Sequence, residues 1–457
     1  MSDELPTAAR VSDPGIRALY RRENRWQAWL DVEAALAKAQ AALGVIPRPA
    51  ADAIARAARL ELLDRARIDE GFARTGHTIV PLVWELSRIV GEPHGGWVHW
   101  GATTQNITQT GDLLVLRDAH RAFLRLIAGA LAAMADLAEH GAEMPIAGRT
   151  HGQHAVPATF GYKPAVWIDE MIRHVERLRQ AAPRIFVAML GGGAGTFASL
   201  GEQGPAVQAG IATALGMLPM TVPARTLGDH LAENICLLGL LAGTCGKIAR
   251  EIYTLMKTEY GEVEEPVPPG TVGSSTMPQK RNPKLCQDII AASAEVRAAV
   301  PLALEAMQTE HEADRTTSLV MEAAEARACI ATGDMLSRLV EVLRGLRLDP
   351  ARMRKNLDLG GGLIMAEAVM LNLGAVIGRQ HAHDVVYDAA QAAFIEGRPF
   401  GAVLAEDPRV TAHLDRKAID GLLDPTAYTG LCAEMAREAA ARARAAAAEI
   451  ARNTADT

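Results

Sequence analysis

The stretch ENRWQAWLDVEAALAKAQAALGVIP, residues 23–47, shows the pattern that decides the fold class of this chain. Trp26, Trp29 and Leu36 fall on one face of an α-helix, together with smaller apolar residues, because they recur at helical spacing. Gly44 follows the last turn, where glycine commonly ends a helix. The stretch therefore predicts an amphipathic helix that buries one face.

The same helical spacing runs through most of the chain, and no run reads as a convincing strand. Helices of about 30 residues are about 45 Å long, which suits a long central bundle. The longest apolar patterns span residues 111–140, 163–186, 226–258 and 284–310. We expect an all-α protein with an N-terminal helical domain, a central long-helix bundle and a C-terminal helical domain, over residues 1–108, 109–355 and 356–457.

Composition and charge exclude several classes of protein. The 457 residues carry a formal net charge of −7 with no basic block, so no nucleic-acid partner is expected. The five cysteines are scattered without a CxxC pair, which suits reduced thiols. The N-terminal segment MSDELPTAARVSDPG is polar, and no run of about 20 apolar residues occurs. These features predict a cytoplasmic protein with no membrane partner.

Four polar, glycine-bearing segments interrupt the helical pattern. Each places hydroxyls, amides or imidazoles where apolar residues would pack better. Together they offer hydrogen-bond donors, histidines and a serine, which is the set needed to hold carboxylates and to move protons. The segments are TGHTIVPL (75–82), HWGATTQNITQT (99–110), AGRTHGQHAVPATFG (147–161) and GSSTMPQKRNP (273–283).

The last of these segments combines features of a loop and of a helix start. It follows EVEEPVPPGTV, whose prolines and glycine predict an extended, mobile cover. Asn282 is a good N-cap, and Pro283 suits the first helical position. A helix N-terminus beside Lys280 and Arg281 would attract an anion and favour ionisation of a nearby serine hydroxyl. The loop is therefore predicted to carry a serine that acts as a base.

The polar segments also resemble a known family. GSSTMPQKRNP matches the GSSxMPxKxNP signature of the fumarase/aspartase superfamily, and GRTHGQHAVPATFG resembles its T-H-x-Q segment. GATTQNITQT is similar to its S-S/T-N/D-V segment, and GGGAGT to its glycine turn. Residues 23–47 and NLDLGGGLIMAEAVM look like the terminal domains of the branch that holds adenylosuccinate lyase and 3-carboxy-cis,cis-muconate cycloisomerase. The resemblance covers nearly the whole chain.

The resemblance implies a three-domain all-α fold and a homotetramer whose active sites are each assembled from three subunits. It implies a β-elimination without cofactor or metal, which cleaves a C–N or C–O bond of a small succinyl-type polycarboxylate and usually releases fumarate. Ser274 matches the serine that takes the Cβ proton after the loop closes, and His151 matches the histidine that protonates the leaving group. The residues that the resemblance assigns to substrate binding are His77, Thr103, Thr104, Gln105, Thr150, Gln153, Ser275, Lys280 and Asn282.

Departures from the family pattern bear on the substrate. The glutamate that usually pairs with the T-H histidine is Gln287, an amide that can orient His151 but cannot stabilise its cation as a carboxylate would. The R-D-R segment of adenylosuccinate lyase is GDH (228–230) here, and its R-Y-S-R-P and S-x-E-R elements are not retained. Losing several phosphate-binding groups argues against a nucleotide substrate. The pattern favours a lyase for a small polycarboxylic acid with an unidentified leaving group.

Three alternatives stay open for the function. A 3-carboxy-cis,cis-muconate cycloisomerase-like enzyme is supported by the segments DPTAYTGLCAEM and GRQHAHDVVYDAA, although that enzyme commonly lacks the histidine found at position 151. Adenylosuccinate lyase is disfavoured by the missing phosphate-binding groups. A structural protein that reuses the fold, as the lens crystallins do, is disfavoured by the retained Ser274, Lys280 and Asn282.

Simpler interpretations exist for several of these features. The serine loop could be an ordinary loop, the histidines could be structural, the polar residues 103–105 could cap a helix, and Lys280 could be a surface charge. QHAHD (380–384) invites a metal site, but it more simply starts a helix. GGGAGT (191–196) lacks GxGxxG spacing and a preceding strand, so it predicts a turn between helices.

Overall fold

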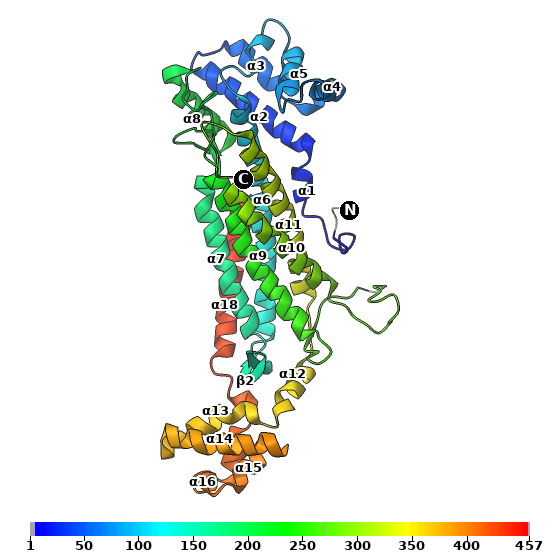
Figure 1. Cartoon of the computed structure of the whole chain (residues 1–457), viewed down its shortest axis with the longest axis vertical. Helices are drawn as coiled ribbons and strands as arrows, with labels where there is room; N and C mark the ends of the chain where they lie inside the picture. The colour runs from blue at the N-terminus through cyan, green and yellow to red at the C-terminus, as the bar shows by residue number, and fades with distance from the viewer. Residues whose placement is uncertain (1–4, 269, 456–457) are drawn as a thin grey trace. The chain divides into compact units, whose positions relative to one another are not determined.

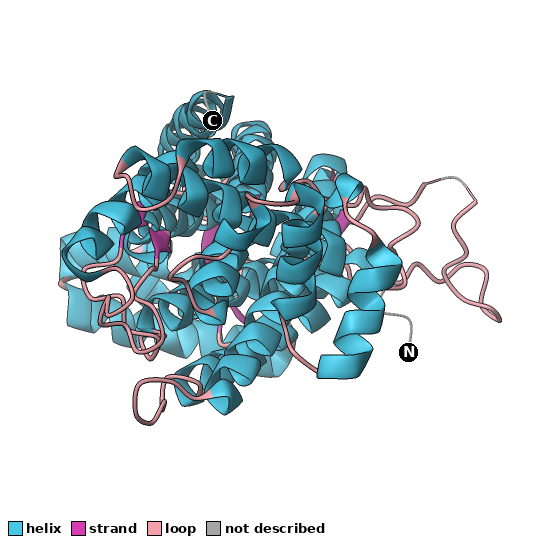
Figure 2. Cartoon of the chain, turned by 90° about the horizontal axis from the view of Figure 1, so that it is seen from above, coloured by secondary structure: helices cyan, strands magenta, loops and turns pink. Residues whose placement is uncertain are grey.

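The computed structural model describes residues 5–268 and 270–455. Within these residues eighteen α-helices dominate, and the strands are six short segments in three two-stranded sheets (Figure 2). The all-α fold class predicted from the helical spacing is confirmed. Pro269, in the middle of the predicted mobile cover, lies outside the described residues.

The chain divides into two compact units, and each unit is built from three stretches of sequence. The first comprises Met1–Arg125, His174–Cys245 and Ala291–Ser337, and the second comprises Leu126–Arg173, Gly246–Ile290 and Arg338–Thr457. The division into three domains near residues 108 and 355 follows sequence texture instead, and it stays a prediction.

The first unit contains short helices, 3₁₀ turns and one parallel strand pair (labelled in part in Figure 1). The elements that lie wholly within it are α1 (Ile16–Leu19), α2 (Arg22–Ala42), α3 (Arg48–Ala57), η1 (Leu60–Leu62), α4 (Arg65–Thr75), α5 (Val80–Val90), η2 (Gly95–Trp97), β3 (Val187–Ala188), η3 (Gly201–Gln203), α8 (Gly204–Leu215) and β4 (Leu218–Pro219).

Five long helices contribute residues to both units, and the four long patterns predicted from the sequence fall on four of them, α6, α7, α9 and α10. The five helices are α6 (Thr104–His140), α7 (Tyr162–Ile185), α9 (Asp229–Leu255), α10 (Lys284–Glu305) and α11 (Arg315–Gly345).

The second unit adds two antiparallel strand pairs and the C-terminal helices. The elements wholly within it are β1 (Pro145–Thr150), β2 (Gln153–Thr159), β5 (Val263–Glu264), β6 (Arg347–Leu348), α12 (Pro350–Leu357), η4 (Asp358–Gly360), η5 (Leu363–Met365), α13 (Ala366–Ile377), α14 (Arg379–Glu396), α15 (Phe400–Glu406), α16 (Pro408–Thr411), α17 (Arg416–Leu422), η6 (Pro425–Ala427) and α18 (Cys432–Ala455).

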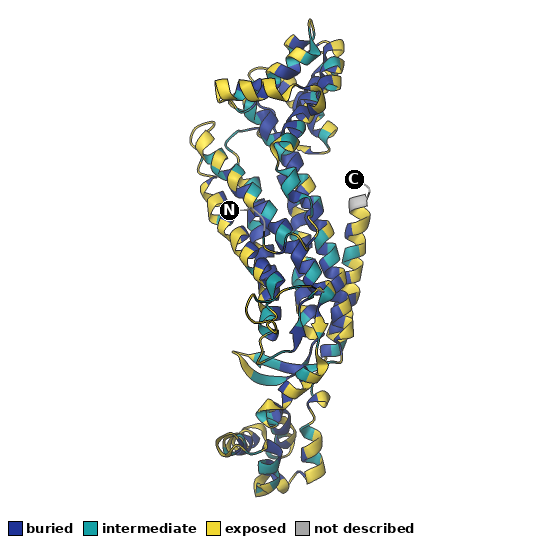
Figure 3. Cartoon of the chain, turned by 90° about the vertical axis from the view of Figure 1, so that its right-hand side faces the viewer, coloured by how far each residue is buried: buried dark blue, intermediate teal, exposed yellow. Residues whose placement is uncertain are grey.

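Helix α2 shows how the sequence pattern becomes packing. Trp26, Trp29 and Leu36 are all buried, and α3 and α8 pack against the helix. Just after the helix, Gly44 has a φ of 72°, a conformation in which a Cβ would be strained. The predicted buried face and its stop signal are therefore both present, and Figure 3 shows similar buried faces along the other helices.

The hairpin of β1 and β2 was not predicted, because no run of the sequence reads as a strand. Its strands are antiparallel, and the register shifts between Ala147 and Arg149. A Cβ on Gly148 would lie 2.5 Å from the carbonyl oxygen of Val156, so glycine is required at this irregularity. The shift and the polar residues hide the alternation that marks a strand. The expectation that the chain forms no strand is wrong for this hairpin, and also for the two-residue strands β3, β4, β5 and β6.

Helix α9 is long and apolar enough to meet the length and composition of a membrane span. However, 56% of its most apolar window is buried inside the fold, as in a core helix. The segments Pro350–Gly360 and Leu363–Ile377 meet the same criterion only when they are counted together, across a bend of 80°.

Candidate functional site

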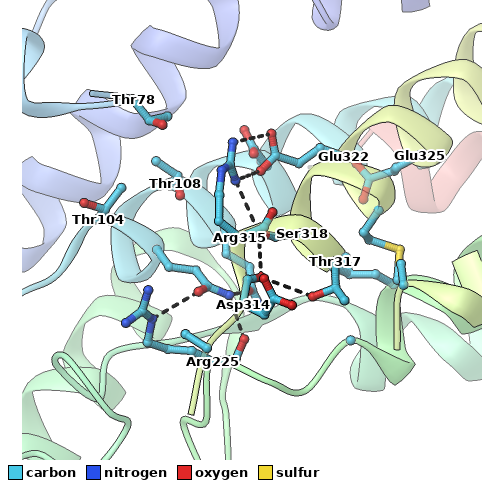
Figure 4. Close-up of a pocket in the computed structure, with 18 of the residues that line it drawn as sticks. Thr78, Thr104, Thr108, Arg225, Asp314, Arg315, Thr317, Ser318, Glu322 and Glu325 are labelled. Carbon is cyan, nitrogen blue, oxygen red and sulfur yellow. Dashed lines mark hydrogen bonds and ion pairs between the residues drawn. The ribbon is translucent and has the colours of Figure 1, made fainter. Parts of the chain in front are cut away.

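A pocket of about 450 Å³ lies within the first unit, a size that suits a small metabolite (Figure 4). Its walls come from the chain before α5, the first turns of α6, the segment before α9 and the start of α11. Much of the lining is polar or charged, so the pocket is suited to a hydrophilic ligand.

Three of the predicted substrate-binding residues line this pocket: His77, Thr104 and Gln105. Thr103 is not part of the lining. It directly precedes α6, and its N–H donates to Oδ1 of Asn106 at 3.0 Å. The structure therefore places Thr103 at the start of a helix, in keeping with the simpler interpretation of this residue.

His77 is exposed, and its ring contacts the start of α5. Its Nδ1 accepts hydrogen bonds from the N–H groups of Ile79 and Val80, each at 3.4 Å. A ring nitrogen that accepts carries no proton, so the neutral imidazole holds its proton on Nε2. Nε2 is thus the atom with which His77 can donate to a ligand in the pocket.

Gln105 and Arg225 hold one another in the pocket wall. Nε2 of Gln105 donates to the carbonyl oxygen of Arg225 at 2.8 Å, and Nε of Arg225 donates to Oε1 of Gln105 at 3.1 Å. Nη1 of Arg225 donates to the carbonyl oxygen of Gly193 at 2.6 Å, and burial lowers the pKa of the guanidinium. Among the described residues no carboxylate pairs with Arg225. Sequence reasoning missed this cation, whose only signal is one arginine in a loop.

A group of acids and bases on α2, α6 and α11, together with Tyr20 at the end of α1, lines one side of the pocket. Arg25 donates twice to Asp112, from Nε at 2.9 Å and from Nη2 at 2.6 Å, and its Nη2 lies 3.4 Å from Glu322. The hydroxyl of Tyr20 donates to Oε1 of Glu325 at 3.4 Å. Burial, helped by the charge of Asp112, raises the pKa of Glu325 to about 8. The surroundings of Glu325 therefore favour its protonated, neutral form, a property that the sequence did not indicate.

The second unit carries the other predicted residues, beginning with the tip of the β1–β2 hairpin. Thr150 pairs with Gln153, so His151 and Gly152 are the two turn residues, with φ of 52° and 77°. Two positive φ values are typical of a type I′ turn. Positive φ is uncommon for a residue with a Cβ, and such strain is often retained at functional sites. His151 is exposed at this tip.

Hydrogen bonds join the two ends of the serine loop, here called the loop neck (residues 272–273 and 282–284). Nδ2 of Asn282 donates to the carbonyl oxygen of Gly273 at 2.8 Å, and Nζ of Lys284 donates to that of Val272 at 2.7 Å. A Cβ on Gly273 would lie 1.8 Å from the carbonyl oxygen of Lys280, so only glycine fits there. Ser275 and Lys280 are exposed. Asn282 thus closes the loop neck, in addition to any contact with a ligand.

Ser274 is half-buried within the loop. Its Oγ accepts hydrogen bonds from the N–H groups of Thr276, at 3.3 Å, and Met277, at 3.1 Å. Two backbone donors therefore already point at the atom that was predicted to act as the base.

The start of α10 differs from the prediction in two ways. The helix begins at Lys284, and its first amides are capped by Glu265, not by Asn282. The two carboxylate oxygens of Glu265 accept from the N–H groups of Leu285 and Cys286 at 3.0 and 3.1 Å. The anion site predicted at this helix N-terminus is thus filled by the chain's own carboxylate. Gln287 is exposed on the first turn.

The two remaining motifs have the predicted local structures. QHAHD lies at the start of α14, which begins at Arg379. GGGAGT forms the predicted turn between α7 and α8, where Gly192 and Gly195 have φ of 72° and 77°. The expectation that no strand precedes it is wrong, because the two-residue strand β3 ends just before the motif. The N–H of Gly192 donates to Oδ1 of Asn106 at 3.1 Å, which ties this turn to the start of α6.

Known proteins resemble the chain over nearly its whole length. A family model described as "Lyase" matches residues 9–298, and one described as "Adenylosuccinate lyase C-terminus" matches residues 362–439. The chain is 39% identical to N-acetyl-S-(2-succino)cysteine lyase of Enterococcus italicus, over 93% of both chains. It is 41% identical to 3-carboxy-cis,cis-muconate cycloisomerase of Pseudomonas aeruginosa, over 91% of both chains.

A solved structure agrees with these sequence relatives. The structure of fumarate lyase from Mesorhizobium sp. BNC1 is 36% identical, has a TM-score of 0.88, and covers 94% of this chain and 98% of that chain. The "Lyase" match includes all four polar segments, those with the pocket residues and those with the hairpin and the serine loop.

Proposed function

Because the chain belongs to the fumarase/aspartase superfamily of lyases, we propose that it catalyses β-elimination on a small succinyl-type polycarboxylate and releases fumarate. The family match, together with relatives named as lyases and a cycloisomerase, supports an enzyme over a structural protein. The proposed chemistry uses side chains alone.

The hydrogen bonds to Ser274 are the observation that carries this proposal. Donors that point at an oxygen stabilise its charged form, so the N–H groups of Thr276 and Met277 favour a Ser274 alkoxide. This base takes a proton from the carbon next to a substrate carboxylate, and the electron pair delocalises into that carboxylate. The pair then forms the C=C bond as the leaving group departs and takes a proton from His151.

The dianion formed in this step needs fixed donors. We assign the substrate carboxylates to Lys280, Asn282, Thr104 and Gln105, with His77, Thr103, Thr150, Gln153 and Ser275 around them as the resemblance implies. Arg225 is added as a cation of the pocket wall. We propose a homotetramer in which the pocket of one copy works with hairpins and serine loops of other copies.

The charges of the pocket favour a small substrate over a nucleotide. Arg25 is paired with Asp112, and Arg315 is paired with Glu322, so neither is available for a phosphate. Arg225 is the pocket arginine that has no carboxylate partner among the described residues. Phosphate recognition usually relies on several such cations.

The leaving atom is the open part of the proposal. The relative from E. italicus is named for a succinylated thiol. A C–S bond is therefore a third candidate for the bond that is cleaved, beside the C–N and C–O bonds expected from the resemblance. A cycloisomerase is the second candidate, because the chain is 41% identical to the P. aeruginosa enzyme. His151, which the cycloisomerase commonly lacks, favours the elimination.

An ultraviolet assay of fumarate release tests the proposal. The panel holds succinylated cysteines, adenylosuccinate, argininosuccinate, aspartate, malate and 3-carboxymuconate. Ser274→Ala should lower kcat on the active compound by about 10² to 10⁴, because it removes a general base. Thr276→Ala is the matched control, since it removes a hydroxyl from the same loop and keeps the N–H that donates to Ser274.

Fumarate release from a succinyl compound, lost with Ser274→Ala and kept with Thr276→Ala, is the expected result. Turnover of 3-carboxymuconate alone would move the assignment to the cycloisomerase. An enzyme that releases fumarate from none of these compounds would contradict the succinyl substrate class.

A further inference from the structure

Glu262 is a fully buried carboxylate that joins three segments of the second unit. Nη1 and Nη2 of Arg149 donate to its two oxygens at 2.9 and 2.7 Å. Nδ2 of Asn356, on α12, donates to Oε1 at 2.7 Å. The Glu262 side chain is 0% exposed, so its charge depends on these donors.

Arg149 connects this carboxylate to the His151 turn. It lies in β1, two residues before His151, directly after the register shift at Gly148. Its guanidinium also stacks over the ring of Tyr260, with Cζ 4.9 Å from the ring centroid. A bulge re-aims the side chain that follows it, and here it turns the Arg149 side chain into the unit's interior. The two hydrogen bonds to Glu262 and the contact with Tyr260 thus hold the strand that ends in the turn.

Glu262 is itself held at the root of the serine loop. Its N–H donates to the carbonyl oxygen of Leu255 at 2.9 Å, and its own carbonyl oxygen accepts from the N–H of Asp349 at 3.0 Å. Three residues later, Glu265 caps α10. The chain from 262 to 265 is therefore fixed at both ends, and the segment that leads to Ser274 leaves from a rigid base. The expected mobile cover can begin only after residue 265.

His151 has no such anchor of its own. Its side chain is exposed and makes no hydrogen bond with the described residues. The position of the imidazole is therefore set by the backbone of the turn, and the nearest side-chain anchor of that backbone is Arg149. A buried ion pair adds little net stability compared with an apolar pair, but it can specify one geometry.

We propose that Arg149 and Glu262 are positioning residues for the proton transfer from His151. Through Arg149 the strand that presents His151 is fixed to Glu262, and the backbone of Glu262 is itself anchored at the root of the Ser274 loop. This inference rests on the proposed function, in which His151 protonates the leaving group. Neither residue needs to touch the substrate in order to act.

Glu262→Gln is the first test, because it keeps the shape and removes the charge that binds Arg149. On the substrate found in the fumarate assay, kcat should fall by about 10- to 100-fold with little change in KM, since a small displacement of a catalytic group has such an effect. The loss should grow as the leaving group becomes more basic, because basic leaving groups depend most on an acid. If the role of Glu262 were purely structural, kcat would fall by the same factor for all substrates.

Two further variants make the test decisive. Arg149→Lys keeps the charge but cannot donate twice, so it should show a smaller loss with the same dependence on the leaving group; it replaces Glu262→Gln if that variant does not fold. Glu251→Gln is the matched control, because it removes another ion-paired glutamate of the same unit, 2.7 Å from Lys163. This control should leave the leaving-group dependence unchanged.

Hydrogen–deuterium exchange separates this inference from the proposed function. Deuterium uptake by the peptide of residues 145–159 should rise in Glu262→Gln and not in Glu251→Gln, even if the wild-type enzyme releases no fumarate from the panel. Unchanged uptake in folded Glu262→Gln overturns the positioning role. If deuterium uptake rises but kcat is unchanged, or if only KM changes, the connection between this positioning role and proton transfer is overturned.

Discussion

Glu325 is a carboxyl group whose surroundings favour its neutral form. Burial raises its pKa to about 8, whereas an exposed glutamate has a pKa of about 4.3. Between these pH values the folded state binds more protons than the unfolded state. The contribution of Glu325 to stability is thus complete below about pH 4.3 and is lost as the pH rises through about 8. Glu325→Gln removes this dependence.

Thermal unfolding at a series of pH values measures the effect. From about pH 5 to about pH 9, the Tm of the wild type should fall relative to that of Glu325→Gln, so that the difference changes steadily in favour of the variant. The comparison cancels the titration of groups that the two proteins share. Two parallel curves would show that Glu325 titrates normally in the folded protein.

Single side chains also show what the sequence could and could not predict. The motifs identified His77, Thr104 and Gln105, and these three line one pocket. Arg225 and Glu325 were missed because neither lies in a motif. Their properties come from neighbours distant in sequence: Gln105 is 120 residues from Arg225, and Tyr20 is 305 residues from Glu325. Local patterns carry no record of such neighbours.

The start of α10 gives a prediction about a helix. Glu265→Ala would leave the buried N–H groups of Leu285 and Cys286 without their acceptor, at a cost of about 1–3 kcal/mol in the free energy of unfolding. Glu264→Ala is the control, because Glu264 pairs with two arginines whose side chains are 58% and 75% exposed. Loss of such surface pairs changes stability by at most about 1 kcal/mol. Urea denaturation compares the two variants.

Equal destabilisation by these two substitutions would mean that the Glu265 cap contributes no more to the free energy of unfolding than the surface ion pairs of Glu264 do.

The start of α10 also shows why local sequence rules fail at some helix ends. The prediction chose Asn282 as the cap because it directly precedes the predicted helix, but the acceptor is a glutamate twenty residues before Leu285. The helical spans themselves were predictable, because burial of one face repeats along the element. The β1–β2 hairpin was not, because its register shift breaks the period.

The assembly is the largest structure that the chain is expected to form. In a single copy of the chain, the long helices leave several leucines exposed: Leu240 on α9, Leu302 on α10 and Leu319 on α11 are 53%, 46% and 52% exposed. Burying one leucine side chain contributes about 1.5–3 kcal/mol, so covering several favours association. We expect light scattering to give four times the 48.7 kDa of one chain.

A glutamate at position 302 should oppose this association, because its charge would be buried without a partner. Leu302→Glu is expected to lower the mass and, with it, kcat, since the proposed active sites need several copies. Phe394→Glu is the control, because Phe394 is 75% exposed on α14, outside the long helices, and should change neither quantity. A monomeric, active wild type would contradict the shared sites. A Leu302→Glu protein of low mass with full kcat would show that one copy holds a complete site, and the roles of the hairpin and the serine loop would then have to be met within a single chain.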